Sequence, residues 1–124
     1  MLDGASVQVF LLATERKRTR VFFEDVLELR FLAEDEFALT FEAGGAVLRV
    51  ALVESFTPQI GTALGWRVPD VAAAVRDLAG RGIRFERFPG MEQDDLGIWT
   101  PPGGGSVAWF KDPDGNTLSI SGLA

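Results

Sequence analysis

The feature that most constrains the fold is an order of segments that occurs twice along the chain. Each half reads as a strand, a helix and then further extended runs. After each helix comes a similar short segment: residues 28–31 read Glu-Leu-Arg-Phe and residues 82–85 read Gly-Ile-Arg-Phe, at a spacing of 54. A recurring unit of this kind is typical of a fold built from two copies of one module. We therefore expect an α+β fold of two strand-helix-strand-strand-strand modules.

In the first half, hydrophobic spacing predicts where each segment lies. Residues 7–12 predict a strand that is apolar on both faces apart from Gln8. A helix capped by Thr14 is expected next. Its buried positions would be Val21, Phe22, Val26 and Leu29. Three extended runs follow, at residues 29–33, 37–42 and 46–54. Gly44 and Gly45 predict a hairpin between the last two runs.

The second half repeats this order. Strands are predicted at residues 63–68, 83–88, 97–100, 106–110 and 117–121. Pro69 and Asp70 are expected to open a helix. Its buried stripe would be Val71, Ala74, Val75 and Leu78. The Asp-Pro-Asp-Gly-Asn sequence at residues 112–116 predicts a turn before the last strand. We expect one domain over residues 1–124, with modules at about 5–55 and 62–122.

The composition limits the classes of protein to which this chain can belong. The chain has 124 residues, of which 12 are basic and 18 acidic, for a formal net charge of −6. This length suits one compact domain, and the acidic balance argues against a nucleic-acid partner. No apolar stretch approaches the roughly 20 residues that span a bilayer. The N-terminus also lacks the basic region of a targeting signal. We therefore expect a cytoplasmic protein with no membrane partner.

The sequence contains no Cys, no His and no Tyr. Without Cys there can be no disulfide, thiolate zinc site or cysteine nucleophile. Without His there is no Ser-His-Asp triad, no imidazole acid or base, and no iron site of two histidines and one carboxylate. Much familiar enzyme chemistry is thereby excluded.

Three segments carry a more specific signal. Residues 22–27 read Phe-Phe-Glu-Asp-Val-Leu, residues 68–71 read Val-Pro-Asp-Val, and residues 108–116 read Ala-Trp-Phe-Lys-Asp-Pro-Asp-Gly-Asn. In these segments the chain resembles the vicinal oxygen chelate superfamily of glyoxalases, bleomycin-resistance proteins and dioxygenases. The resemblance covers nearly the whole chain. It implies two βαβββ modules whose mixed sheets form a cup, with helices on the outside and a ligand or metal within.

The same resemblance implies where a metal would be held. Enzymes of this superfamily place ligands on the first strand of each module and near the end of each module's last strand. Here those positions fall on Gln8, Ala63 and Ser119, with the fourth at Arg49 or Ala51. Gln is a weak ligand, Ala offers no donor atom, and a Ser hydroxyl rarely binds a metal. We expect no metal and no other cofactor, which argues against metal-dependent glyoxalase or dioxygenase chemistry.

Strand alternation predicts which side chains share the cup face with those positions. The inward sets would be Gln8, Phe10 and Leu12; Val47, Arg49 and Ala51; Ala63, Gly65 and Arg67; and Thr117, Ser119 and Ser121. Trp66 would point toward the helix layer instead. The candidate ligand-binding residues are Gln8, Phe10, Arg49, Arg67, Trp99, Trp109 and Ser119. No residue is assigned a catalytic role.

Two interpretations of these side chains stay open. Arg49 and Arg67 would bind a carboxylate, sulfonate or phosphate if they face a cavity. Alternatively, each pairs with a glutamate across the strands, at Glu42, Glu54 or Glu86. Trp99 and Trp109 are either aromatic walls of a ligand site or ordinary core residues.

We favour a metal-free small-molecule binding protein of the bleomycin-resistance type, holding an anionic or aromatic ligand in the cup. A first alternative is a glyoxalase-like lyase or isomerase that uses a cup carboxylate, Glu42 or Glu86, as a base. A second is a non-catalytic regulatory domain. The resemblance further implies a homodimer, since related two-module chains commonly form one.

Overall fold

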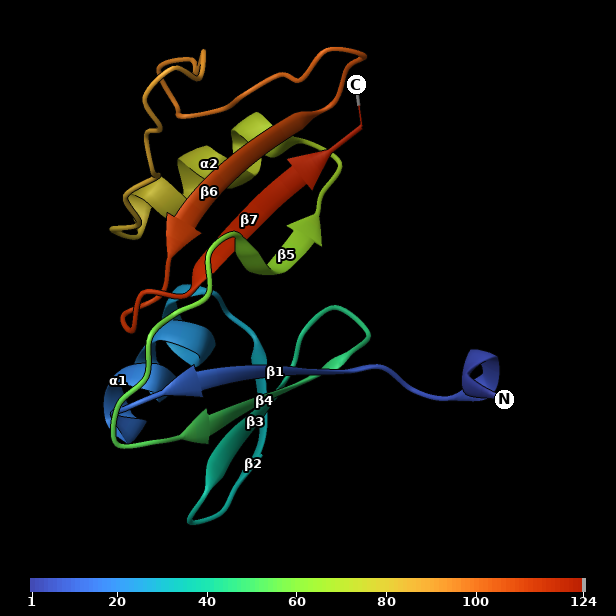
Figure 1. Ribbon diagram of the computed structural model, residues 1–124, viewed down its shortest axis with the longest axis vertical. Coiled ribbons are helices and arrows are strands. Elements are labelled where there is room, and N and C mark those ends of the chain that lie inside the picture. Colours follow the sequence, from blue (N-terminus) through green and yellow to red (C-terminus); the bar gives the residue numbers. More distant parts are fainter. Residues whose placement is uncertain (124) are drawn as a thin grey trace. The chain divides into compact units, whose positions relative to one another are not determined.

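The computed structural model describes residues 1–123 and divides the chain into two compact units, Met1–Thr57 and Pro58–Ala124. Each unit contains one mixed β-sheet and helical structure against one face of it (Figure 1). The predicted α+β fold of two modules is confirmed. None of the helices in the described part is long or apolar enough to cross a membrane.

The N-terminal unit is built on a four-stranded sheet in the order β1-β4-β3-β2. The strands are β1 (Gln8–Ala13), β2 (Arg30–Glu34), β3 (Ala38–Glu42) and β4 (Val47–Leu52). β1 runs parallel to β4, whereas the other neighbours are antiparallel. Gly44 and Gly45 have φ values of 67° and 93°. This left-handed conformation closes the predicted hairpin between β3 and β4.

The helix of this unit begins differently from the prediction. α1 (Arg16–Arg20) is capped by Glu15 and not by Thr14. Glu15 has the extended backbone of an N-cap residue, and its carboxylate accepts the Arg18 N–H at 2.5 Å. A glutamate is an uncommon cap, so the sequence preference for threonine pointed one residue too early.

α1 continues directly into a π-helical turn, η2 (Val21–Val26). Its Leu27 N–H donates to the Phe22 carbonyl, five residues back, at 3.0 Å. Phe22 and Phe23 of this turn are both buried, with 7% and 1% exposed. Val21 was predicted to be buried, but it is 53% exposed. The prediction used the regular α-helical period, which this turn does not follow.

The core of the N-terminal unit lies between η2 and one face of the sheet. Phe23 packs on Phe41, with ring centroids 5.5 Å apart. The sheet contributes several side chains with no exposed area from β3 and β4, including Leu39, Phe41, Leu48 and Val50. The predicted alternation of β1 and β4 is therefore observed, with Leu11 buried and Phe10 on the opposite face.

The C-terminal unit contains β5 (Thr62–Arg67), α2 (Val71–Gly80), β6 (Ser106–Lys111) and β7 (Thr117–Gly122). The strand order is β5-β7-β6, with β5 parallel to β7. Asp70 caps α2 as predicted, because its carboxylate accepts the Ala73 N–H at 3.0 Å. Val71 and Val75 of α2 are buried on β6 and β7.

The internal sequence repeat has a structural counterpart. Glu28 and Gly82 follow the helix of their own unit, and both have positive φ, of 58° and 96°. Phe31 then packs on Phe41 at 5.8 Å, while Phe85 packs on Phe110 at 5.5 Å. The similar short segments at residues 28–31 and 82–85 thus follow the helix and place a phenylalanine against a buried phenylalanine of the sheet in the same way in each unit.

The two units differ on the outer side of β6. There, a fourth strand position is occupied only by two isolated bridges, Phe85 with Phe110 and Trp99 with Val107. The strands predicted at residues 83–88 and 97–100 are therefore wrong as regular strands. Between the two bridges the chain leaves the sheet edge over residues 87–98, a segment that we call the excursion.

Side chains of the excursion replace the missing sheet hydrogen bonds. The Phe88 N–H donates to Gln93 Oε1 at 2.8 Å, and Pro89 has no N–H to offer a strand. Gln93 Nε2 donates to the carbonyls of Glu86 and Gly97, both at 2.9 Å. The segment is therefore held by its own side chains, which explains why it does not extend the sheet.

The predicted turn at residues 112–116 joins β6 to β7. The Asp112 carboxylate accepts the N–H groups of Asp114 and Asn116, at 3.0 and 2.9 Å, and the Asn116 side-chain amide at 2.8 Å. Gly115 supplies the positive φ of 90° that the turn needs. Burial nevertheless raises the pKa of the Asp112 carboxyl, against the effect of these hydrogen bonds. This segment is thus explained by the turn that it forms.

Candidate functional site

The face of the C-terminal sheet that lies away from α2 gathers most of the predicted site residues of this unit. We call it the helix-distal face. The strand register arranges its side chains in two rows across the strands. The first row is Gly65, Ser119 and Trp109. The second row is Arg67, Ser121 and Val107, continued by Trp99 through its bridge to Val107.

Three aromatic side chains, Phe88, Trp99 and Trp109, form what we call the aromatic shelf. The ring centroids of Trp99 and Trp109 lie 6.1 Å apart, and Phe88 meets Trp109 edge-on at 5.4 Å. The Trp109 Nε1–H donates to Thr62 Oγ1 at 3.2 Å, which holds the indole across the sheet. All three rings are partly exposed. The shelf therefore offers a preorganised aromatic surface to a ligand.

Ser119 lies beside this shelf in the central strand. It is only 8% exposed, yet its hydroxyl makes no hydrogen bond with any described residue. A Cβ placed on Gly65 would collide with the Ser119 Oγ. The hydroxyl therefore opens toward β5 only because residue 65 has no side chain.

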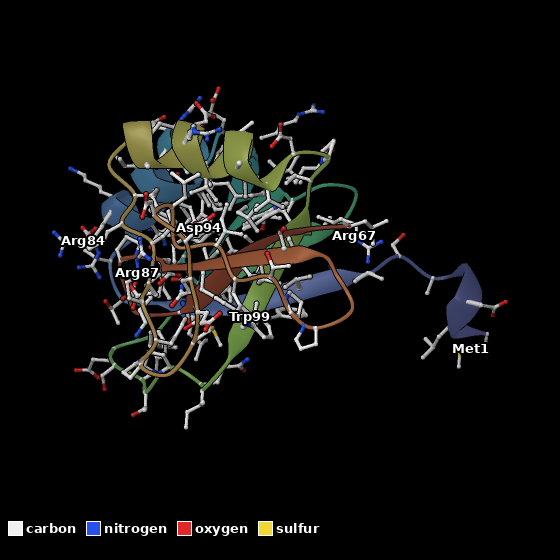
Figure 2. The ribbon with its side chains drawn as sticks, turned by 90° about the horizontal axis from the view of Figure 1, so that it is seen from above. Met1, Arg67, Arg84, Arg87, Asp94 and Trp99 are labelled. Atoms are coloured by element: carbon white, nitrogen blue, oxygen red, sulfur yellow. The ribbon has the colours of Figure 1, made fainter. Side chains whose placement is uncertain are left out.

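Arg67 ends β5 at the other edge of the same face. Its exposed guanidinium makes no hydrogen bond or ion pair with the described residues, so the alternative pairing with Glu86 is not formed. In Figure 2, Arg67 lies toward one end of the C-terminal unit and Arg87 toward the other, with Trp99 between them. Arg67 is thus free to contact an anion at this end of the second row.

One carboxylate extends the first row beyond β6. The Glu86 N–H donates to the Trp109 carbonyl at 2.7 Å, and alternation from Phe85 places the Glu86 side chain on the helix-distal face. Glu86 is half-buried and has no ion-pair partner among the described residues. It stands at the corner diagonally opposite Arg67.

A pocket of about 790 Å³ opens between the excursion and the returning chain. Its lining is Gly90, Met91, Glu92, Gln93, Asp94, Ile98, Trp99, Thr100 and Pro102. Arg87 closes the base of the excursion by donating to the carbonyls of Asp94 and Asp95, at 2.5 and 2.7 Å. Trp99 belongs to both the pocket and the aromatic shelf.

The remaining candidates, Gln8, Phe10 and Arg49, lie in the N-terminal unit on the face away from η2. Phe10 pairs with Arg49 in the register and is 61% exposed, and Gln8 is also exposed. Arg49 forms an ion pair at 3.5 Å with Asp35. The alternative in which Arg49 pairs with a glutamate is thus wrong in its partner.

Asp35 is itself held by the main chain. It accepts the N–H groups of Phe37 and Ala38 at 2.8 and 2.9 Å. The Phe37 hydrogen bond, together with that of Ala38 and the charge of Arg49, lowers the pKa of the Asp35 carboxyl below its ordinary value. Arg49 is therefore already engaged, unlike Arg67.

The positions that would carry a metal do not form a metal site. Gln8 is an exposed amide, Arg49 is an ion-paired guanidinium, Ala51 and Ala63 have no donor atom, and Ser119 offers a single neutral hydroxyl. Within residues 1–123, no group of three or more Asp or Glu side chains is arranged to hold a metal. The donor set does not fit a divalent cation.

Sequence reasoning missed several residues of the helix-distal face. Thr62, which orients Trp109, and Phe88, which completes the shelf, lie in segments whose local pattern carries no sign of a contact. Both contacts join residues far apart in the chain. Ser121 was placed on the face by alternation but was not singled out, because one serine on a strand carries no specific signal.

No protein-family model and no curated protein matches the chain. Solved structures do resemble it over nearly its full length. A glyoxalase family protein from Enterococcus faecalis has a TM-score of 0.75 at 21% identity, covering 98% of this chain and 99% of that one. The chain has the glyoxalase/bleomycin resistance/dioxygenase fold. The predicted resemblance is therefore confirmed at the level of the fold.

Other structures with the glyoxalase fold differ in their named function. Lactoylglutathione lyase from Agrobacterium tumefaciens has a TM-score of 0.73 at 16% identity, covering 96% of this chain and 93% of that one. A glyoxalase/bleomycin resistance protein/dioxygenase from Alicyclobacillus acidocaldarius has a TM-score of 0.72 at 14% identity, covering 97% and 92%. Since one fold hosts several activities, function must be argued from the site.

Proposed function

We propose that this chain is a metal-free small-molecule binding protein of the bleomycin-resistance type. The observation that carries the proposal is the helix-distal face, which has the aromatic shelf at its β6 edge and, at its β5 edge, an Arg67 that is unpaired among the described residues. A preorganised aromatic surface binds a planar ligand at little cost in side-chain entropy. The donor set at Gln8, Ala63 and Ser119 supports binding without a metal.

The test is a thermal-shift screen of the full chain against divalent metals, anionic metabolites and planar aromatic drugs. A ligand at 100 times its Kd that binds only the native state adds about 2.7 kcal/mol of stability. For a domain of this size, each kcal/mol raises Tm by roughly 4 °C. We expect Tm to rise with an aromatic or anionic compound and to stay constant with metals.

The variant Trp99→Leu should abolish that shift, because it removes one ring of the shelf. Trp66→Leu is the matched control, since Trp66 shares a register row with the buried Ile120 and lies on the α2 side of the sheet. A rise in Tm with Mn²⁺, Ni²⁺ or Zn²⁺ that EDTA reverses would contradict the proposal. So would the absence of a shift with every organic compound.

Glu86 favours one second candidate, a lyase or isomerase. It is half-buried beside the shelf and could accept a proton from a bound ligand. Glu42, the other carboxylate considered, is 49% exposed and lies 3.9 Å from Arg30, which leaves it a solvated ion pair. Turnover of S-lactoylglutathione by the wild type but not by Glu86→Gln would establish this candidate and replace the first one.

We further propose a homodimer with no nucleic-acid partner. Light scattering coupled to gel filtration measures the mass directly, against 13.5 kDa for the single chain. A mass of one chain at all concentrations would exclude the dimer.

A further inference from the structure

We propose that the ligand is a planar aromatic acid lying along the second row, with its acidic group on Arg67 and Ser121 and its ring against Trp99. This inference rests on the proposed function and names the ligand class of that site. The row Arg67, Ser121, Val107 and Trp99 crosses the whole sheet and carries a cation at one end and an aromatic ring at the other.

The dimensions of the row suit a small molecule. Arg67 and Trp99 are three strand spacings apart, or roughly 14 Å at about 4.8 Å per spacing. Both side chains are long enough to extend several ångströms toward each other along the row. The floor between them is made of two short side chains, Ser121 and Val107. The space that remains fits one ring and a short acidic arm.

The charge of the helix-distal face favours a ligand that carries an acidic group. None of the three strands contains Asp or Glu, although the whole chain has 18 acidic residues. Arg67 is exposed and unpaired among the described residues, and the hydroxyl of Ser121 lies next to it in the row. An unpaired guanidinium beside a hydroxyl is a typical carboxylate contact.

Other charged side chains lie around the second row. Glu86 lies in the first row at the opposite corner of the face, and Lys111 lies at the far end of β6. Glu92 and Asp94 line the pocket that Trp99 shares, at the aromatic end of the second row. All four are separated from Arg67 by at least the width of the sheet. The acid-binding end of the second row therefore carries one positive charge and no close negative charge from this sheet.

The end of the second row at Trp99 favours a ligand with a planar ring. Trp99 is tilted by 31° to Trp109, and the branched side chain of Val107 lies between Trp99 and Ser121. A planar ring can cover Val107 and contact both indoles, whereas a saturated ring is too thick to do so closely. Aromatic contacts of this kind contribute about 0.5–1.5 kcal/mol beyond the area that they bury.

The test is an NMR titration of the ¹⁵N-labelled full chain with three probes. Cinnamate carries both the ring and the acid. Cinnamamide has the ring without the charge, and 3-cyclohexylpropionate has the charge without the aromatic ring. The indole N–H signals of Trp99 and Trp109 should move with cinnamate, while that of Trp66 on the opposite face should not. Both other probes should bind at least about tenfold more weakly.

Paired variants locate the acidic group. Arg67→Gln should weaken cinnamate about tenfold or more, because it removes a charge-assisted hydrogen bond. Arg84→Gln changes the net charge equally, lies at the other end of the C-terminal unit (Figure 2), and should leave the Kd within about twofold. Ser121→Ala should weaken binding about threefold, and Ser119→Ala in the first row should have less effect.

Three results would overturn the inference while leaving the proposed function intact. The first is equal binding of cinnamamide and cinnamate with both shelf indoles shifted. The second is an equal loss of affinity in Arg67→Gln and Arg84→Gln. If no probe moves the Trp99 signal but another compound raises Tm in the thermal screen, the aromatic-acid class is also wrong. Failure of the whole screen would instead overturn the proposed function.

Discussion

At Gly65 the absence of a side chain is a packing requirement set by a neighbouring strand. A Cβ at this position would collide with the Ser119 hydroxyl and lie 3.4 Å from the Ser119 carbonyl oxygen. Gly65 has no positive φ, so an alanine would meet no backbone strain there. Its cost would come from the side chain of Ser119 alone.

We therefore predict that Gly65→Ala destabilises the chain by about 1–3 kcal/mol, the usual cost of overpacking. In a Ser119→Ala background the same substitution should be neutral or stabilising, because the colliding atom is gone and alanine suits a strand better than glycine. Urea unfolding of the two single variants and the double variant measures the coupling. Strictly additive losses would show that the collision is not the cause.

For single residues, the sequence predicted on which face of a strand a side chain lies, but it did not predict which residues that side chain contacts. Alternation placed Phe10, Arg67 and Ser119 correctly on their faces, because a strand has a fixed period of two. It could not identify Asp35 as the partner of Arg49, because that contact joins a turn to a strand. Long-range pairings leave no trace in local spacing.

Among the elements, the π-helical turn η2 determines the core of the N-terminal unit. It presents two consecutive phenylalanines, Phe22 and Phe23, to the sheet. The sequence signal was the Phe-Phe pair itself, but the helical period predicted Val21 in place of Phe23. A prediction that assumes 3.6 residues per turn throughout a helix cannot detect a local π-helical turn.

Phe23→Ala should cost about 3–5 kcal/mol, because it leaves a cavity beneath Phe41. Phe37→Ala is the control, since Phe37 is 64% exposed and its loss should cost under about 0.5 kcal/mol. The free energies of unfolding in urea give both values. Similar losses in the two variants would contradict the burial that η2 creates.

The excursion at residues 87–98 contains no regular strand, and Gln93 forms an isolated bridge with Trp99 there. Gln93 satisfies one N–H and two carbonyl groups there, so removing its amide should release the segment. We predict that Gln93→Ala is cleaved faster than wild type after Glu92 by a glutamate-specific protease. The global stability should fall by only about 1–2 kcal/mol.

Gln59→Ala serves as the control for this experiment. Gln59 makes one hydrogen bond, at 3.4 Å to the Thr62 carbonyl, outside the excursion. Unchanged cleavage after Glu92 in Gln93→Ala would show that the segment does not depend on this side chain. Sequence patterns predicted a strand up to residue 88 and another from residue 97, but they could not show the hydrogen bonds by which Gln93 holds the segment between them.

For the whole molecule, two carboxyl groups make opposite contributions to stability in acid. The pKa of Asp35 is lowered from 3.8, so the stability it provides is present above that pH and is lost as pH falls below it. The pKa of Asp112 is raised from the same value, so its contribution is present at low pH and is lost as pH rises through the raised pKa.

Asp35→Asn should therefore flatten the loss of stability below about pH 4, whereas Asp112→Asn should flatten the opposite slope just above that pH. Urea unfolding between about pH 2.5 and 5.5 measures both. Glu36→Gln is the control, because Glu36 is an exposed neighbour that makes no hydrogen bond among the described residues. A curve for Asp35→Asn that parallels wild type would contradict the role of the Phe37 and Ala38 hydrogen bonds.

The absence of acidic residues from the three strands of the C-terminal sheet has a kinetic consequence. A chain of net charge −6 repels an anion at long range, while the helix-distal face attracts it at short range. Raising the ionic strength from 0.01 M to 0.15 M shortens the Debye length from about 30 Å to about 8 Å, which screens the repulsion first. Capture of an aromatic acid should then become faster with added salt, the reverse of what a basic binding protein shows.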